Sequence, residues 1–556
     1  MSATTFAAKS LTQKLDAAYE KTRGTPVKEL LDVIMANDLT DPMDLQVRYI
    51  LDNDPIAASI SNQIKASLAT QTKAIAHGLL LSSGLTSDTK GSEYYPEIYK
   101  LYQESLKKLG FSTTSIARAR LHVINSPQIN AFTYSGLDGL PEVVVYKGLI
   151  DNLSPKEVQA VLGHELAHIK NRHVYHSMML EFLFFETGRI LIPASQQFFL
   201  LQKMQARLDS LIQERLFAAG GASPQITSAI KANLTKTFRE ISTHLRENFS
   251  QEELFALTSK LTATLDRKES SESEKADSEP SPLQTAEMNE DDMADMMDMK
   301  AQMEEFQKRM ARLSRSAEKS SDQWGSVVAG ADNSANALIR LAIGTEGDPR
   351  AALEQAKEAE RILRENPLVR GMVTESSSHP NLMDRATYLA AFSKQDVYQL
   401  YHPKNAFKRS LRDYTILTDQ LESLDQNPNA AVYEGSEFRT MQANRSDLTD
   451  FLSALSDILS DAIVEEIKKD NRKTYPHSEQ LIAFLHDLGY TLGEEHFKQN
   501  RFLPKLKNKL IELPQSQAVA LLVQQIEERT PPNSKRSAIE EFRHSSKGCE
   551  GELSAS

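Results

Sequence analysis

The chain has 556 residues, a formal net charge of −12 and a pI near 5.7. This length exceeds what one hydrophobic core normally supports and predicts roughly two to four domains. The acidic balance argues against a nucleic-acid-binding surface as the main function. The single cysteine, Cys549, lies in a polar tail, so no intramolecular disulfide can form and a thiolate metal ligand is not expected.

The first residues lack a basic stretch followed by an apolar core, so we predict no secretory signal and expect a cytoplasmic protein. The stretch most similar to a membrane span is Met178 to Leu201, but Glu181, Glu186 and Arg189 interrupt it. We therefore predict a buried helix or helical hairpin and no transmembrane segment. Peripheral contact with a membrane surface and signal-independent secretion both stay open.

Residues 1–92 are predicted to be a helical region, because apolar residues recur at helical spacing in Val27–Met35 and Ile60–Leu81. We find no pattern of catalytic residues there. A further amphipathic helix is expected over Tyr94–Leu109.

Two short β-branched runs, Leu121–Ile124 and Glu142–Tyr146, are bounded by Pro and Gly and are predicted to be strands. They precede the most informative helix of the chain. A small sheet in this place could hold a substrate peptide in extended form along its edge.

Residues 157–173 contain no proline and one glycine and are predicted to be helical. His164 and His168 lie four residues apart, on one face, and can each give a nitrogen to one zinc ion at about 2.1 Å. Glu165 is turned about 100° from His164, where it can reach a metal-bound water without being a ligand. The motif taken alone also occurs by chance in ordinary helices.

Residues 203–307 are predicted to be a helical insert, with helices over Met204–Leu216 and Ile226–Phe249. A charged, serine-rich segment at about 266–287 has almost no apolar content and is predicted to be a disordered linker. The methionine-rich run Met288–Met310 favours a flexible packing surface over a copper site.

A zinc site with two histidines needs a third protein ligand and an open position for water. Glu318 and Asp322 are four residues apart and share a helix face. The glutamate could bind zinc while the aspartate fixes the tautomer of a ligand histidine. Spacing alone nevertheless favours an ordinary solvated helix.

Residues 396–556 are predicted to be helical and carry no catalytic pattern. One segment has apolar side chains at regular helical spacing, which predicts a core or a helix-partner surface. These residues are Leu448, Phe451, Leu452, Leu455, Ile458, Leu459, Ile463 and Ile467.

Several motifs together give the chain a resemblance to the HtpX and CAAX prenyl protease family of zinc metallopeptidases, which are gluzincins. In chain order they are Asn130-Ala131-Phe132, Gly148-Leu149-Ile150, Ser154 to Glu157, His164 to His173, Ser314-Arg315 with Glu318 and Asp322, Gly347 to Ala352, and His379-Pro380 followed by Arg385. Each motif is modest, but their joint order is specific. The resemblance covers residues 93–202 and 308–395, less than half of the chain.

The resemblance implies that Glu318 completes a metal site with His164 and His168, holding one zinc ion per chain. It also implies that Asp322 supports a ligand histidine from the second coordination sphere. Glu165 would then act as the general base.

For the substrate side, the resemblance implies that His379 donates a hydrogen bond to the oxyanion and that Arg385 braces the site. It places Asn130, Ala131 and Phe132 beside the substrate-binding edge strand.

The chain departs from the family in lacking the membrane-spanning helices of many members and in having Ser321 where alanine is usual. His173 lies five residues after His168, without the glycine turn of a metzincin. On a continuous helix it would point about 140° away from His168, so we predict a structural role for it.

We therefore predict a mostly α fold with a small β-sheet, in which an α+β zincin core (93–202 and 308–395) is joined to the N-terminal, inserted and C-terminal helical regions. The predicted function is a soluble zinc metalloendopeptidase acting on proteins or peptides. The alternative is a latent or inactive peptidase-fold scaffold, or chaperone, that binds partner proteins. The helical regions could bind such partners or self-associate.

Overall fold

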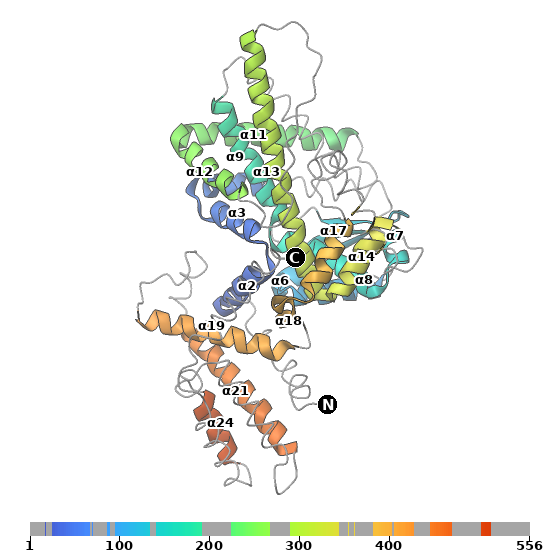
Figure 1. The fold of residues 1–556 in the computed structure, drawn as a ribbon, viewed down its shortest axis with the longest axis vertical. Helices are drawn as coiled ribbons and strands as arrows, with labels where there is room; N and C mark the ends of the chain where they lie inside the picture. The colour runs from blue at the N-terminus through green and yellow to red at the C-terminus, as the bar shows by residue number, and fades with distance from the viewer. Residues whose placement is uncertain are drawn as a thin grey trace. The chain divides into compact units, whose positions relative to one another are not determined.

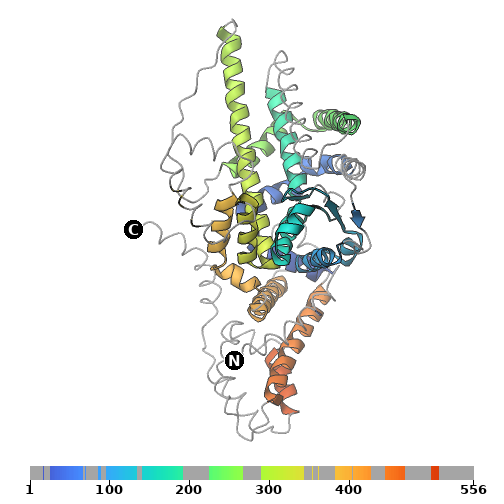
Figure 2. The same cartoon turned by 90° about the vertical axis from the view of Figure 1, so that its right-hand side faces the viewer.

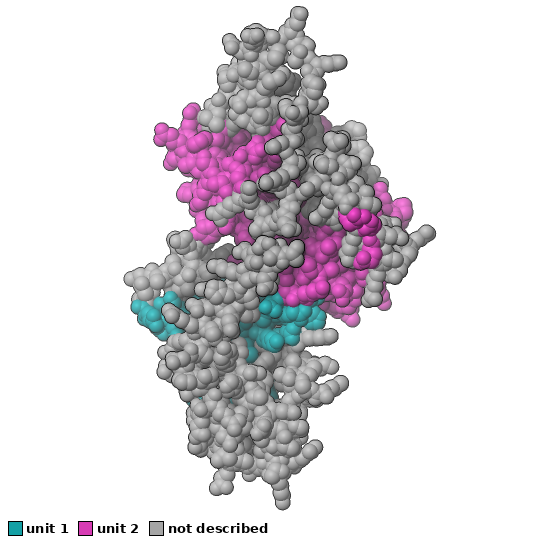
Figure 3. All heavy atoms as spheres, viewed as in Figure 1, with its two compact units in different colours: residues 1–35, 396–556 teal, residues 36–395 magenta. Residues whose placement is uncertain are grey.

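The computed structural model describes residues 25–66, 86–88, 95–133, 141–191, 224–266, 290–343, 382–402, 405–426, 445–469 and 502–512, together with residues 17, 69, 354, 358 and 361. These parts are mostly helical with one small sheet, which confirms the predicted fold class (Figure 1). The chain forms two compact units, residues 1–35 with 396–556 and residues 36–395, coloured separately in Figure 3. The finer predicted division into four regions stays a prediction.

The first unit is helical throughout its described parts. It contains α18 (Asp396–Tyr401), α19 (Ala406–Gln426), α21 (Arg445–Lys469), α24 (Phe502–Ile511) and the beginning of α2 (Pro26–Leu39). The apolar stripe predicted on residues 448–467 lies on α21, where Leu452, Leu455 and Leu459 are buried in one hydrophobic cluster. From Leu448 to Ile463 that stripe is core, one of the two roles that the spacing predicted.

The second unit contains a four-stranded sheet formed by β1 (Thr86–Asp88), β2 (Arg120–Ile124), β3 (Ala131–Thr133) and β4 (Glu142–Tyr146). The strand order is β1-β2-β4-β3, with β2 and β4 parallel and the outer pairs antiparallel. All five residues of β4 are buried, as expected of a central strand rich in valine. Both strands predicted from the sequence are confirmed.

The second unit also contains most of the described helices. They are α3 (Pro42–Asn53), helical residues 55–66, α5 (Pro96–Lys108), α6 (Thr113–Arg118), α7 (Lys147–Asn152), α8 (Pro155–Lys170), α9 (His173–Leu191), α11 (Pro224–Asn248), α12 (Gln251–Leu265), α13 (Glu290–Ala329), α14 (Ala331–Ile343) and α17 (Leu382–Phe392). Of these, α7 and α8 contact the sheet. Helix α8 contacts β3 and β4 as well as α13, and Figure 2 shows it between the strands and α13.

Helix α8 has well-defined ends. Ser154 and Glu157 form a capping box at its start, with Pro155 in the first turn, so that two backbone N–H groups without helical partners are satisfied. The helix ends at Lys170, and Arg172 adopts a left-handed φ of 57°. The single helix expected over 157–173 is therefore wrong at its end, because the chain turns at Arg172 and α9 begins at His173.

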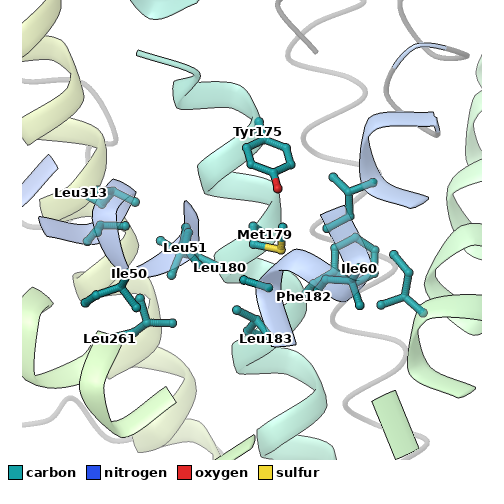
Figure 4. Close-up of a cluster of buried hydrophobic side chains, with 14 of the residues drawn as sticks. Ile50, Leu51, Ile60, Tyr175, Met179, Leu180, Phe182, Leu183, Leu261 and Leu313 are labelled. Carbon is teal, nitrogen blue, oxygen red and sulfur yellow. The ribbon is translucent and has the colours of Figure 1, made fainter. Parts of the chain in front are cut away.

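Helix α9 carries one side of the main hydrophobic core of this unit. Tyr175, Met179 and Phe182 from α9 pack with Ile50 of α3 and Leu261 of α12 (Figure 4). The predicted helix is thus confirmed as far as residue 191, and its burial as far as Thr187. Within the described helices, no segment is both long and apolar enough to cross a bilayer.

Some predicted features lie outside the described residues. They are the helix over 204–216, most of the linker at 266–287, the motif at 347–352 and His379.

Candidate metal centre

The candidate site forms where α8 and α13 cross at two glycines. A Cβ atom on Gly163 would lie 3.1 Å from the Cα of Gly325, and one on Gly325 would lie 3.1 Å from the backbone nitrogen of His164. Such close approach of two helix backbones leaves no room for a side chain between them. The crossing places His164 opposite the C-terminal part of α13.

We expect Gly325→Val to push these helices apart. Crowding of this kind costs about 1–3 kcal/mol of unfolding free energy, and it should also weaken metal binding by displacing residues of α13 from α8. The measurement is the denaturant midpoint together with zinc content. Ala311→Val, about four turns earlier on the same helix, is the matched control and should leave the zinc content unchanged.

Three side chains meet beside the crossing. The Nε2 atoms of His164 and His168 are 3.0 Å apart. The carboxylate of Glu318 lies 3.3 Å from Nε2 of His164 and 3.7 Å from Nε2 of His168. Among the described residues, this is the single group of three histidine, cysteine or carboxylate side chains close enough to hold one metal ion.

The donor set fits zinc. Two imidazoles and a carboxylate are the protein ligands of a gluzincin-type site, and donors about 2.1 Å from a tetrahedral zinc stand about 3.4 Å apart. The observed separations of 3.0, 3.3 and 3.7 Å bracket that value. Glu318 is 4% exposed, whereas the two histidines are partly buried, so the carboxylate side of the site is the more deeply buried.

Asp322 and Arg385 surround this group on its protein side. Asp322 accepts from Nδ1 of His164 at 2.9 Å, which leaves Nε2 of that ring directed at the other ligands. Arg385, from α17, donates to both oxygens of Asp322 at 2.7 and 2.8 Å and lies 2.8 Å from Glu318. Its guanidinium therefore fixes both carboxylates in place through charge-assisted hydrogen bonds.

The electrostatics distinguish the two histidines. Burial alone would lower the pKa of His164, but its hydrogen bonds to Asp322 and Glu318 raise that pKa to about 10. Burial also lowers the pKa of His168, and there the attraction of Glu318 does not compensate. Burial alone would raise the pKa of Asp322, but the charge and hydrogen bonds of Arg385, together with the hydrogen bond and charge of His164, lower it overall.

The remaining predicted site residues lie as follows. Glu165 is half-buried on α8, and its charge acts on Arg385. Ala131 and Phe132 are in β3, which ends the sheet among the described strands and contacts α8. Asn130 precedes that strand, and its carbonyl accepts from the backbone of Tyr146 at 3.0 Å.

Sequence reasoning missed two residues of this region. Because the chain turns at Arg172, His173 folds back so that its Nδ1 lies 2.8 Å from Nδ1 of His168. Its Nε2 lies 2.8 Å from the carboxylate of Asp44 on α3. The premise of a continuous helix was wrong, although His173 lies outside the metal cluster. No sequence signal links Asp44 to this site.

Part of the chain is similar in sequence to known metallopeptidases. The model of peptidase family M48 matches residues 95–222. A protease HtpX homolog from Pelotomaculum thermopropionicum is 38% identical over 82 residues, which are 15% of this chain and 27% of that protein. No solved structure matches the chain.

Two further relatives align with a longer and a shorter stretch of this chain. The plastoglobule-localized metallopeptidase 48, chloroplastic, of Arabidopsis thaliana is 32% identical over 138 residues, 25% of this chain and 37% of that protein. Protease HtpX of Escherichia coli O1:K1 / APEC is 39% identical over 56 residues, 10% of this chain and 19% of that protein.

The chain thus spans well under half the length of these relatives. The match includes His164 and His168 and ends before Glu318. Residues 95–222 are therefore similar to peptidase family M48 and to protease HtpX homologs, the resemblance that the sequence motifs in this part of the chain indicated.

Proposed function

We propose that this chain is a zinc-dependent metalloendopeptidase in which His164, His168 and Glu318 hold one zinc ion. The observation that carries the proposal is the meeting of these three donors, from two separate helices, at separations suited to tetrahedral zinc. The match of the first two ligands to peptidase family M48 supports the same assignment.

A zinc ion in this site would lower the pKa of a water molecule in its open position toward about 7 and polarise the substrate carbonyl. The protein's own contribution begins with Asp322, which keeps the proton of His164 on Nδ1. Glu165 follows the first ligand directly on α8, and its carboxylate would take the proton from the attacking water. It would then return that proton to the leaving amine.

Strand β3 gives the proposed substrate a place to bind. It ends the sheet among the described strands, all three of its residues are half-buried, and it lies beside α8. An extended peptide could add to this edge through backbone hydrogen bonds. Phe132 packs edge-on against Tyr146, with ring centroids 6.2 Å apart, and so supports the strand from the core. His379 is proposed to stabilise the oxyanion.

The proposal is tested by measuring zinc per chain in the purified protein and cleavage of an unfolded protein such as casein. We expect one zinc ion per chain, cleavage that a chelator abolishes, and recovery when zinc is added back. Absence of bound zinc would contradict the metal site. Zinc without cleavage, together with stoichiometric binding of a partner protein, would favour the scaffold alternative.

The proposed substrates are proteins or peptides. A cytoplasmic location is part of the proposal, supported by the use of a single cysteine in 556 residues.

A further inference from the structure

A chain of hydrogen bonds leads from the second histidine of the metal group to a buried aspartate. Nδ1 of His168 is 2.8 Å from Nδ1 of His173, and Nε2 of His173 is 2.8 Å from Oδ2 of Asp44. We infer that Asp44 and His173 are positioning residues that hold His168 in the tautomer required for zinc binding. This inference rests on the proposed metal site.

The chemistry of the groups sets the direction of this chain. An ionised carboxylate can only accept hydrogen bonds, so Asp44 takes the proton-bearing Nε2 of His173 as its donor. A histidine ring that binds a metal through Nε2 carries its proton on Nδ1, so His168 in that state donates from Nδ1 and His173 accepts at its own Nδ1. Nε2 of His168 is thereby left with its lone pair, on the side where Glu318 and His164 lie.

The surroundings of Asp44 favour its ionised form. It is 3% exposed, and burial alone would raise its pKa. The charge of His173 and the hydrogen bonds from His173 and Ser320 outweigh that effect and lower the pKa overall. His173 is 6% exposed, so water does not compete freely for either end of the His173–Asp44 contact.

Two further features fix the position of the hydrogen-bonded chain Asp44–His173–His168, which we call the relay. The left-handed residue Arg172 ends α8 and brings His173 back toward the ligand that precedes it by five positions. Hydrogen bonds hold the start of α3, which carries Asp44, against the part of α13 that contains Glu318. The bonds run from the backbone N–H of Asp41 to Ser320, from Ser316 and Lys319 to the carboxylate of Asp41, and from Trp324 to Thr40.

The relay mirrors the support of the first ligand. His164 is held through Nδ1 by Asp322, which lies on the same helix as Glu318. His168 is held through Nδ1 by His173, and through it by α3. Helix α3 lies before residues 95–222, the segment that matches peptidase family M48. The N-terminal helices therefore contribute to the metal site in addition to packing against it.

The test compares zinc dissociation constants, measured by competition with a chromophoric chelator, for the full-length protein and three variants. Asp44→Asn removes the anionic acceptor with little change in volume, and His173→Phe removes the bridging ring nitrogens while keeping an aromatic side chain. Both should bind zinc roughly 10–100-fold more weakly, the loss typical of outer-sphere partners of metal ligands. Asp52→Asn is the matched control, because Asp52 is also an acidic residue of α3 but pairs with Arg172 and His176. It should bind zinc like the wild type.

A second measurement uses only the wild-type protein, so it does not depend on whether a variant folds. In the metal-free wild-type protein labelled with ¹⁵N-histidine, His168 should carry its proton on Nδ1 and His173 on Nε2. An Nε2-protonated His168 overturns the inference, as do folded Asp44→Asn and His173→Phe variants that bind zinc as tightly as the wild type. Wild-type protein that binds no zinc instead contradicts the proposed function itself. The two failures are therefore distinguishable.

Discussion

Replacing Glu165 by glutamine is expected to lower the rate of casein cleavage by roughly 10²–10⁴-fold, the usual contribution of a general base. The amide has nearly the shape of the carboxylate but cannot take up a proton from the attacking water. Because Glu165 is not among the three clustered donors, zinc content should stay at one ion per chain. The measurement is initial cleavage rate alongside zinc content on the same preparation.

Asp151→Asn is a suitable control for Glu165→Gln. Asp151 is an exposed carboxylate on α7, paired with Lys147, and its loss should leave both cleavage and zinc unchanged. A Glu165→Gln protein that still cleaves casein at the wild-type rate would show that another group acts as the base. Loss of zinc from that variant would instead point to Glu165 as a ligand.

The second large effect is expected for Glu318→Gln, which should release zinc during dialysis against a weak chelator. The loss of affinity should exceed the roughly 10–100-fold effect of changing an outer-sphere partner, because an anionic donor is lost from the coordination sphere itself. The variant also leaves the buried guanidinium of Arg385, 2.8 Å from Glu318, with one fewer carboxylate partner. Zinc content and cleavage should therefore fall together.

Glu305→Gln provides the control on the same helix. Its carboxylate is 40% exposed and pairs with Arg309 at 3.6 Å, where an ion pair contributes little. It should retain zinc and activity. If Glu318→Gln bound zinc as tightly as the wild type, the third ligand would have to come from another side chain.

Local sequence patterns were sufficient for much of this protein. The helical spacing around His164 and His168, the valine-rich strand at 142–146 and the apolar stripe on α21 all correspond to elements of the structure. Each depends on residues within a few turns of one another, so the sequence carries the information directly. The two histidines share a face because any α-helix places residues i and i+4 there.

The third metal ligand, Glu318, could not be identified from local sequence patterns alone. The spacing of Glu318 and Asp322 fits a solvated helix as well as a metal ligand, and only the resemblance to a family favoured the second reading. In the structure, the packing of Gly163 against Gly325 brings α13 close enough for the carboxylate to reach both histidines. Which helix packs against α8 is a property of the folded chain, and no periodicity in the sequence encodes it.

The side chains that surround His168 could not be predicted from local sequence patterns either. From sequence, His173 was expected to point away from the second histidine, because a continuous helix was assumed through residue 173. One residue with positive φ, Arg172, reverses that direction, and Asp44 reaches His173 from more than a hundred positions earlier in the chain. Local patterns in the sequence identified His164 and His168 as candidate metal ligands. The tertiary structure decided which third donor meets them and which side chains orient them, because those contacts depend on how distant helices pack.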